Sequence, residues 1–317
     1  MLIANPIYDN AFKFLMEDIN IAKGIIGRII GCEILELDFK PQEYTATTSK
    51  QEMNFLRMDF HALILTKENE KRKVLIELQK SKKSMDLFRF RKYIGEQYQR
   101  IDNILIGKNR KGETVEIPEF YSIIVIYFLG YIEDERFPKV VKLKNHYYDV
   151  LENKEIPGRI EFLEKLNHES YMLQLAVPQS TNGKKPLERM LTVFSETGFH
   201  SRVMEYPDDQ PEEIQSDALV QQLIRRLYKA TQDEKVRKQL EFEEEMERKV
   251  QDLFQTLEEN AKELEENRKA LDEKDKALDE NRKVIFNLAK MLRSAGVSEE
   301  EIRKQTGLSM DEMSKIT

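Results

Sequence analysis

The chain has 317 residues, and its 51 Lys and Arg against 58 Asp and Glu give a net charge of −7. This balance excludes a uniformly basic protein that wraps nucleic acid. The single cysteine, Cys32, excludes a disulfide framework and a multi-cysteine zinc site, and it indicates a reducing compartment. No apolar run approaches the roughly 18 residues of a membrane span, and the N-terminus does not predict a secretory signal. We therefore expect a cytoplasmic protein with no membrane partner.

The first part of the chain predicts an α/β core in the order helix, strand, strand, strand, helix, strand. The expected elements are a helix over Asp9–Ile30 capped by Asp9 or Asn10, extended residues Ile34–Tyr44, strands Phe55–Thr66 and Arg72–Gln79, a helix over Ser84–Ile106, and a buried strand over Tyr121–Phe128.

Residues 130–200 are mixed, with short helices predicted over Glu161–Leu166 and Leu187–Phe194. The polar joint PDDQP, between Pro207 and Pro211, marks a boundary, after which Glu212–Thr231 predicts another helix. The expected organisation is a domain over 1–206, a connecting helix over 207–232, a charged helix over 233–293 and a small terminal motif over 294–317.

The charged helix predicts a coiled coil. Residues 234–283 hold 17 acidic and 12 basic residues and contain no Pro or Gly. Apolar residues recur every seventh position from Leu257 to Leu292, which is one seam of a heptad. The second seam is polar, with Asn260, Asn267 and Lys274. Such residues weaken a coiled coil but fix its register. We expect a homo-oligomer; a solvated helix with one apolar stripe is the alternative.

The last residues have the spacing of a helix-turn-helix. Gly296 ends a helix, Ser298 and Ser309 each begin a capping-box pattern, and Gly307 lies in the predicted turn. Asp311 and Glu312 are acidic and therefore oppose contact with phosphates. We therefore favour a small helical motif that serves packing or faces an oligomer partner over a DNA-binding motif.

A basic stretch lies between Lys67 and Lys92, where ten basic residues face four acidic ones. Such a stretch can attract a polyanion through phosphate contacts and counterion release. A solubilising surface is the alternative, and composition alone leaves both open.

Two carboxylates give the sharpest chemical signal. Side chains alternate along a strand, so Arg57, Asp59 and His61 share one face, and Lys73, Leu75, Glu77 and Gln79 share a face of the next strand. A turn centred on Glu68 and Asn69 pairs residues whose numbers sum to about 136 or 137. The hairpin therefore predicts Asp59 nearly opposite Glu77, with β-carbons about 4.5 to 5.5 Å apart.

Two like charges so close need compensation. A divalent cation with hard oxygen ligands, Mg²⁺ or Mn²⁺, is one solution. The alternative is that Arg57 or Lys73 pairs with one carboxylate on a solvated face. The histidines, His61 among them, are scattered without metal-ligand spacing, so we expect them to be structural or exposed.

Asp59 followed by the IELQK segment, within this order of elements, resembles the PD-(D/E)XK nuclease superfamily and its restriction-endonuclease-like α-β-β-β-α-β core. The chain is most similar to the branch of recombination-promoting nucleases and transposases. The segments YDNAFKFLM, RIEFLEKLNHESYMLQ and TGLSMDE carry the same resemblance, which covers most of the chain.

The resemblance implies that Asp59 and Glu77 hold catalytic Mg²⁺ or Mn²⁺. Gln79 takes the position where the superfamily often has Lys, and the backbone carbonyl of Leu78 can add a ligand. A neutral glutamine can position a water or a phosphate but cannot act as a titrating base. Lys80 does not replace it, because it points to the other face.

Basic residues near this site are expected to contact the DNA backbone: Lys73, Lys80, Arg89, Arg91 and Lys92. Arg89, Tyr93 and Gln97 share one helix face and either orient the acidic site or form a solvated, partly packed surface. Arg57 is expected to support the site, and an acidic residue of the first helix, Asp9 or Glu17, can complete it.

The sequence therefore predicts a metal-dependent DNA endonuclease with a role in recombination or mobile-element movement. The alternative is a nuclease fold that no longer cuts and acts as a DNA-binding or scaffolding protein through its coiled coil. Gln79 is the residue that keeps this alternative open.

Overall fold

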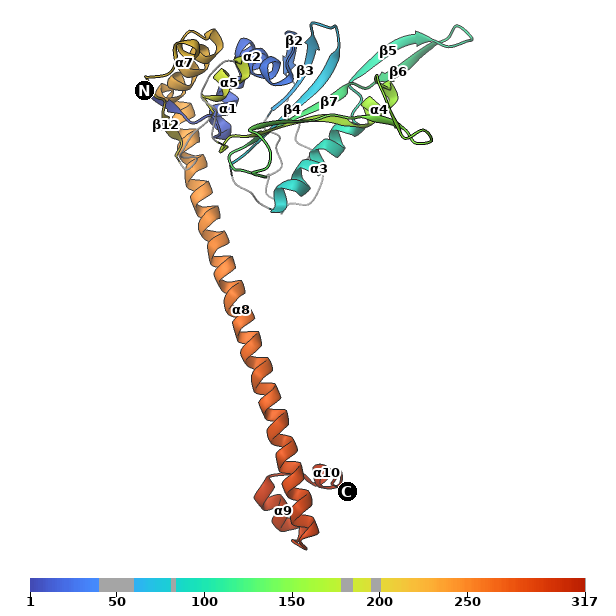
Figure 1. Cartoon of the computed structure of the whole chain (residues 1–317), viewed down its shortest axis with the longest axis vertical. Coiled ribbons are helices and arrows are strands. Elements are labelled where there is room, and N and C mark those ends of the chain that lie inside the picture. The colour runs from blue at the N-terminus through green and yellow to red at the C-terminus, as the bar shows by residue number, and fades with distance from the viewer. Residues whose placement is uncertain (40–59, 81–83, 178–184, 195–200, 317) are drawn as a thin grey trace. The chain divides into compact units, whose positions relative to one another are not determined.

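The computed structural model describes residues 1–39, 60–80, 84–177, 185–194 and 201–316. The chain divides into two compact units, unit 1 over 1–245 and unit 2 over 246–317. Unit 1 is a mixed α/β structure around a six-stranded sheet (Figure 1). The α/β class and the long C-terminal helix are confirmed, whereas the more specific nuclease-like core stays a prediction.

The central sheet has the strand order β2-β3-β4-β7-β11-β8. Its middle strands β4, β7 and β11 are parallel, and the outer pairings are antiparallel. The bounds are β2 Ile34–Phe39, β3 Phe60–Thr66, β4 Lys71–Gln79, β7 Ser122–Leu129, β8 Val140–Leu143 and β11 His168–Gln174. Strands β4 and β7 begin and end within one residue of the predicted bounds.

Helices cover both faces of this sheet (Figure 1). One face, with Val74, Ile76 and Leu78, packs into the main core together with α1, α2, α5 and α7. The other face, with Leu75, packs against α3 through Tyr93. The bounds are α1 Asp9–Met16, α2 Ile19–Ile30, α3 Ser84–Gln99, α5 Pro186–Leu191 and α7 Ala218–Gln232.

Two predicted helices are each broken by an internal aspartate. Asp18 ends the run after α1 and caps α2, where its carboxylate accepts hydrogen bonds from the amides of Asn20 and Ile21. Asp217 likewise separates α6 (Glu212–Gln215) from α7, and its side chain caps α7. The prediction of single helices was wrong because the apolar spacing continues across both breaks, while the side-chain cap favours a new start.

The helix predicted over 84–106 ends at Gln99, and its last apolar residues form a strand instead. Strands β5 (Asn103–Lys108) and β6 (Thr114–Glu119) make a separate antiparallel hairpin. The remaining elements of unit 1 are β1 Leu2–Ala4, β9 Tyr147–Asp149, β10 Lys154–Ile156, α4 Glu161–Leu166 and β12 Val203–Glu205.

Helix α8 runs over Glu234–Ser294, and its residues up to Glu245 belong to unit 1. In unit 2, α9 (Glu299–Thr306) and α10 (Met310–Met313) pack Ile302 and Met313 with Ala289 of α8. Gly307 has φ +73°, the left-handed conformation expected of the predicted turn, and Ser309 forms the predicted capping box. None of the described helices is both long and apolar enough to cross a membrane.

Candidate functional site

The hairpin of β3 and β4 has the predicted register. Phe60 lies opposite Ile76 and Leu65 lies opposite Lys71, so paired residues sum to 136. The predicted alternation also holds, since Val74 and Ile76 face the main core and Leu75 faces α3. Asp59 and Arg57 lie outside the described residues.

Glu77 and Gln79 lie at the carboxyl end of β4, on the face that carries α3. Their side chains are buried, with Glu77 1% exposed and Gln79 6% exposed. Strand β7 runs parallel beside them, which places Tyr127 level with Glu77. The hydroxyl of Tyr131 donates a hydrogen bond to Oε1 of Gln79 over 3.1 Å. A buried carboxylate and an oriented amide therefore share one end of the sheet.

Two tyrosines of the α3 face have raised pKa values: Tyr127 lies at the end that carries Glu77, and Tyr98 lies near the amino end of β11. Burial raises the pKa of Tyr127 to about 12, and the nearby charges of Glu77 and Tyr98 add to the effect. Burial also raises the pKa of Tyr98 to about 12. The hydroxyl of Tyr98 lies 2.8 Å from Nδ1 of His168 at the start of β11. These phenols stay neutral near pH 7 and act as hydrogen-bonding groups.

Lys73 lies inside the protein and not on its surface. Its ammonium lies 2.5 Å from a carboxylate oxygen of Asp102 and donates to the backbone carbonyl of Gln97 over 3.1 Å. Asp102 also accepts a hydrogen bond from the amide of Tyr121. This pair joins β4 to the chain after α3 and to the start of β7, so Lys73 has a structural partner.

Lys80 follows Gln79 and points to the opposite face, as predicted. Its ammonium lies 2.7 Å from Oε1 of Glu243 in α8 and 3.2 Å from the centre of the Tyr8 ring. Glu243 also accepts hydrogen bonds from the amides of Asp9 and Asn10. The side chain that caps α1 is therefore Glu243, and the prediction of Asp9 or Asn10 as the cap was wrong.

The other predicted residues lie as follows. Asp9 is the first residue of α1 and its carboxylate pairs with Lys13. Tyr93 is buried in the cluster that joins α3 to the sheet. Gln97 contributes its backbone carbonyl to Lys73. Glu17 follows α1 and pairs with Arg226.

The α3 cations differ from Lys73 and Lys80. Arg91 and Lys92 are exposed on this helix, and Arg89 lies on it as well. Within the basic stretch, Lys73 and Lys80 are thus held by carboxylates, whereas Lys71 at the start of β4 and Arg91 and Lys92 on α3 are exposed.

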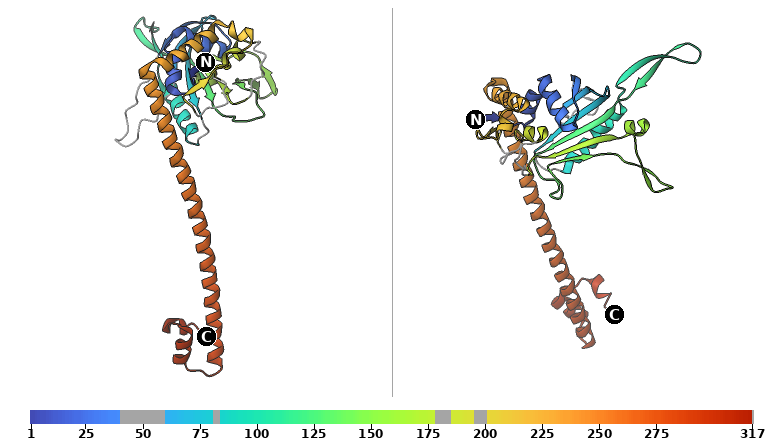
Figure 2. Two further views of the ribbon diagram at one scale, coloured as in Figure 1. Left: turned by 90° about the vertical axis from the view of Figure 1, so that its left-hand side faces the viewer. Right: turned by 45° about the horizontal axis from the view of Figure 1, so that its top comes forward.

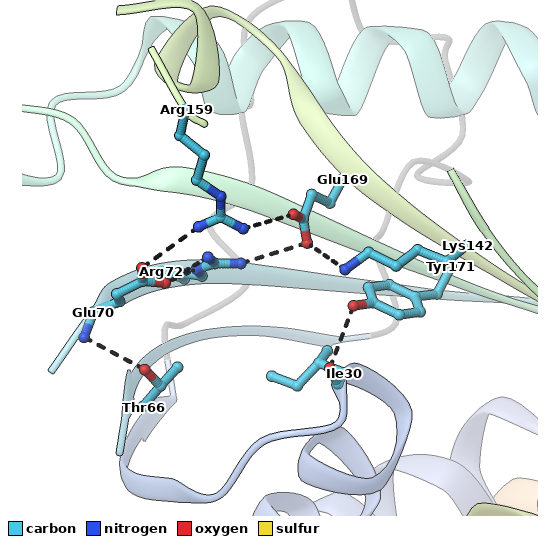
Figure 3. Close-up of polar contacts among 8 residues, drawn as sticks. All are labelled: Ile30, Thr66, Glu70, Arg72, Lys142, Arg159, Glu169 and Tyr171. Atoms are coloured by element: carbon cyan, nitrogen blue, oxygen red, sulfur yellow. Dashed lines mark hydrogen bonds and ion pairs between the residues drawn. The ribbon is translucent and has the colours of Figure 1, made fainter. Parts of the chain in front are cut away.

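A second charged cluster lies near the amino ends of the same parallel strands, on the other face (Figure 3). The carboxylate of Glu169, in β11, is held by three cations: Lys142 at 3.1 Å, Arg159 at 3.2 Å and Arg72 at 3.4 Å. Arg72 and Arg159 also pair with Glu70. These mutual ion pairs indicate a structural role.

Sequence reasoning missed Tyr127, Tyr131 and Asp102. One signal could have found Tyr127: if β4 and β7 are paired as parallel neighbours, a tyrosine in the run YSIIVIYF faces Glu77, and a buried tyrosine needs a polar partner. Asp102 and Glu243 carry no such signal, because their partners lie far away in the sequence.

Within the described residues, no group of three or more His, Cys, Asp or Glu side chains is placed to hold a metal ion. The described part of the predicted site supplies one buried carboxylate, Glu77, and one amide oxygen, Gln79. Both are hard oxygen donors of the kind that Mg²⁺ prefers. A complete ligand set requires Asp59, which lies outside that part.

Comparisons with protein-family models, with curated proteins and with solved structures find no match to this chain.

Proposed function

We propose that this chain is a metal-dependent DNA endonuclease of the PD-(D/E)XK type, with a role in recombination or mobile-element movement. The observation that carries the proposal is the register of the β3–β4 hairpin. Phe60 lies opposite Ile76, and one further step of the same ladder would bring Asp59 opposite the buried Glu77. Two carboxylates at such a rung are close enough to share one divalent ion.

In this proposal Asp59 and Glu77 hold Mg²⁺ or Mn²⁺. A divalent ion held by these two carboxylates would supply Lewis-acid chemistry, that is, polarisation of the phosphodiester and activation of a water. The described residues orient the site: Tyr131 fixes the amide of Gln79, and Tyr127 lies level with Glu77. Gln79 then holds a water or a phosphate oxygen through hydrogen bonds.

Contact with the DNA backbone is assigned to α3, where Arg91 and Lys92 are exposed. Lys73 and Lys80 are left out of this contact because Asp102 and Glu243 hold their ammonium groups. Exposed cations on one helix suit phosphate contacts, which carry little sequence information. We therefore expect weak sequence preference.

The test is cleavage of supercoiled plasmid in Mg²⁺ or Mn²⁺ by the full chain. Wild type should nick or linearise the plasmid, and EDTA, Asp59→Ala and Glu77→Ala should each abolish cutting. Glu36→Ala is the matched control, since Glu36 is an exposed acid on β2 of the same sheet. Cutting by the Asp59 and Glu77 variants at the wild-type rate would overturn the proposal.

A second candidate function is a nuclease fold that binds DNA without cutting it. The observation in its favour is that no cation stands at the third catalytic position: Gln79 is neutral, and its neighbour Lys80 is held by Glu243 on the other face. DNA binding by wild type without cleavage in either metal would favour this candidate.

We also propose that α8 forms a coiled coil with a second copy of the chain. The seam leucines are exposed, from 53% at Leu257 to 70% at Leu264. An apolar seam of this length gains burial only from a partner helix. Light scattering should give a dimer or larger for the full chain and a monomer for Leu264→Lys/Leu271→Lys; a monomeric wild type would contradict the proposal.

A further inference from the structure

The β5–β6 hairpin exposes apolar side chains on both of its faces. Its two strands form a sheet of their own, apart from the six-stranded sheet. Figures 1 and 2 show the strands running away from that sheet, without a helix over the half that carries the turn. Ile106 is 68% exposed, and Ile104, Leu105 and Ile117 are each close to half exposed. A two-stranded hairpin alone is marginally stable in water, so these faces favour a partner.

The turn of the hairpin carries three cations, Lys108, Arg110 and Lys111. The side chain of Asn109 holds the turn: its carbonyl accepts from the amides of Lys111 at 2.9 Å and Glu113 at 3.0 Å. Its amide group donates to the carboxylate of Glu113 over 2.7 Å. The one acidic side chain of the turn is thus engaged locally.

Among the described residues, none of these three cations makes an ion pair. Gly112 has φ +83°, which allows the turn to close without strain. The result is an ordered turn that presents three positive charges to solvent. An ordered, basic tip suits contacts with phosphates, which need fixed positive charge at defined spacing.

The two faces of the hairpin differ in polarity. Leu105 lies opposite Ile117 and Gly107 lies opposite Val115, so the outer part of this face is apolar. Its charged residue, Glu119, lies at the base and accepts hydrogen bonds from Asn103 and Tyr121. A Cβ atom at Gly107 would lie 2.8 Å from Cδ1 of Ile117, so the isoleucine side chain lies across the glycine. The other face is more polar along its length, with Glu116 opposite Ile106 and Lys108 opposite Thr114.

We propose that the β5–β6 hairpin is an arm for duplex DNA, with its tip cations on phosphates and its Leu105–Ile117 face in a groove. A two-stranded β-ribbon fits the major groove, which is about 12 Å wide. Apolar side chains contact the methyl groups of thymine there. Six residues per strand give the arm a reach of about 20 Å. The inference rests on the proposed function in taking DNA as the occupant.

The test measures binding of the full chain to a fluorescent 30-base-pair duplex in EDTA, by anisotropy over a range of salt concentrations. Lys108→Ala/Arg110→Ala/Lys111→Ala should weaken binding by more than tenfold at low salt. It should also lower the slope of log K against log salt by about 2.7, from three phosphate contacts at about 0.9 each. Leu105→Ser/Ile117→Ser should weaken binding while leaving that slope unchanged.

The matched control is Lys144→Ala/Lys154→Ala/Lys185→Ala, which removes three other exposed cations of unit 1. It should keep both the affinity and the salt slope, and circular dichroism melts should show that all variants fold. If Lys108→Ala/Arg110→Ala/Lys111→Ala binds DNA with the wild-type affinity and salt slope, the proposal of a DNA-binding arm is overturned. This holds even if the protein cuts plasmid. Arm-dependent binding without cutting would keep the arm and count against the endonuclease.

One outcome assigns the hairpin to a different partner. If Leu105→Ser/Ile117→Ser changes the oligomeric state in light scattering while DNA binding stays at the wild-type level, the apolar face contacts a second copy of the chain. That result would also overturn the DNA arm.

Discussion

Glu77 and Glu169 are both buried glutamates on the parallel strands of one sheet, yet their surroundings differ. Glu169 lies near the amino ends of the strands, where Arg72, Lys142 and Arg159 hold its carboxylate. Glu77 lies at the carboxyl end of β4 on the opposite face, level with Tyr127. Glu169 is built into a network of ion pairs near the amino ends of the strands, whereas Glu77 lies level with Tyr127 and two residues before Gln79 at the carboxyl end of β4.

The difference between Glu77 and Glu169 indicates which of the two is suited to hold a metal ion. Three cations around one carboxylate already satisfy its charge, so a metal ion would have to compete with them. The carboxyl ends of parallel strands are also where α/β proteins place their ligands. Burial alone, which the two glutamates share, does not separate them.

The largest expected effect is on plasmid cleavage by Glu77→Gln. Substitutions of the groups that merely support metal ligands cost about 10–100-fold, so loss of a ligand charge should cost more than about 100-fold. The cleavage rate in Mg²⁺ measures it. Glu169→Gln is the paired variant and should cut at a rate close to wild type. Equal losses in both variants would show that the two glutamates do not differ in the way described.

The second largest expected effect is a loss of folding stability. It concerns the ion pair of Lys73 and Asp102 on the α3 face of the sheet. Lys73→Met leaves Asp102 buried without its cation, and the two side chains are only 2% and 7% exposed. Breaking such a pair costs about 3–5 kcal/mol of unfolding free energy. Urea denaturation measures the loss. Lys73→Met/Asp102→Leu should recover part of it, and an unchanged midpoint in the single variant would contradict the pairing.

A smaller loss of stability is expected for Glu169→Gln. It removes the charge that three cations share, which should cost about 1–3 kcal/mol. Added salt should reduce the difference in unfolding free energy between Glu169→Gln and wild type. The reason is that Arg159 is 48% exposed, so that salt screens its ion pair with Glu169. Arg159→Ala should cost less than about 1 kcal/mol for the same reason. A Glu169→Gln protein as stable as wild type would show that the cluster provides no net stability.

Much of the central sheet could be predicted from the sequence. Alternation along β4 and the polar turn before it gave the register that pairs Phe60 with Ile76, because both signals are local. The hairpin β5–β6 could not be found in this way. Its run Ile104–Ile106 follows directly on an amphipathic helix, and nothing local distinguishes a continued helix from a strand.

The surroundings of the candidate site were harder to predict than its residues. Lys80 and Lys73 were expected to reach DNA, because a sequence shows a cation but not its distant partner. Glu243 lies 163 residues from Lys80, and the ion pair forms only once the first turns of α8, which belong to unit 1, pack beside β4. The internal caps at Asp18 and Asp217 show the reverse case, a local signal that apolar periodicity concealed.

The smallest expected effect is on the loss of stability at acid pH, and it concerns His168. This residue lies on the α3 face at the amino end of β11, next to Glu169. Burial lowers the pKa of His168 below its usual 6.5. Below pH 6.5 the unfolded chain therefore takes up a proton at this imidazole before the folded protein does, and the free energy of unfolding falls as the pH falls. Urea unfolding at pH 7.5 and 5.5 should show a smaller acid loss in His168→Gln than in wild type. An unchanged loss in His168→Gln would assign the acid sensitivity to groups other than this imidazole.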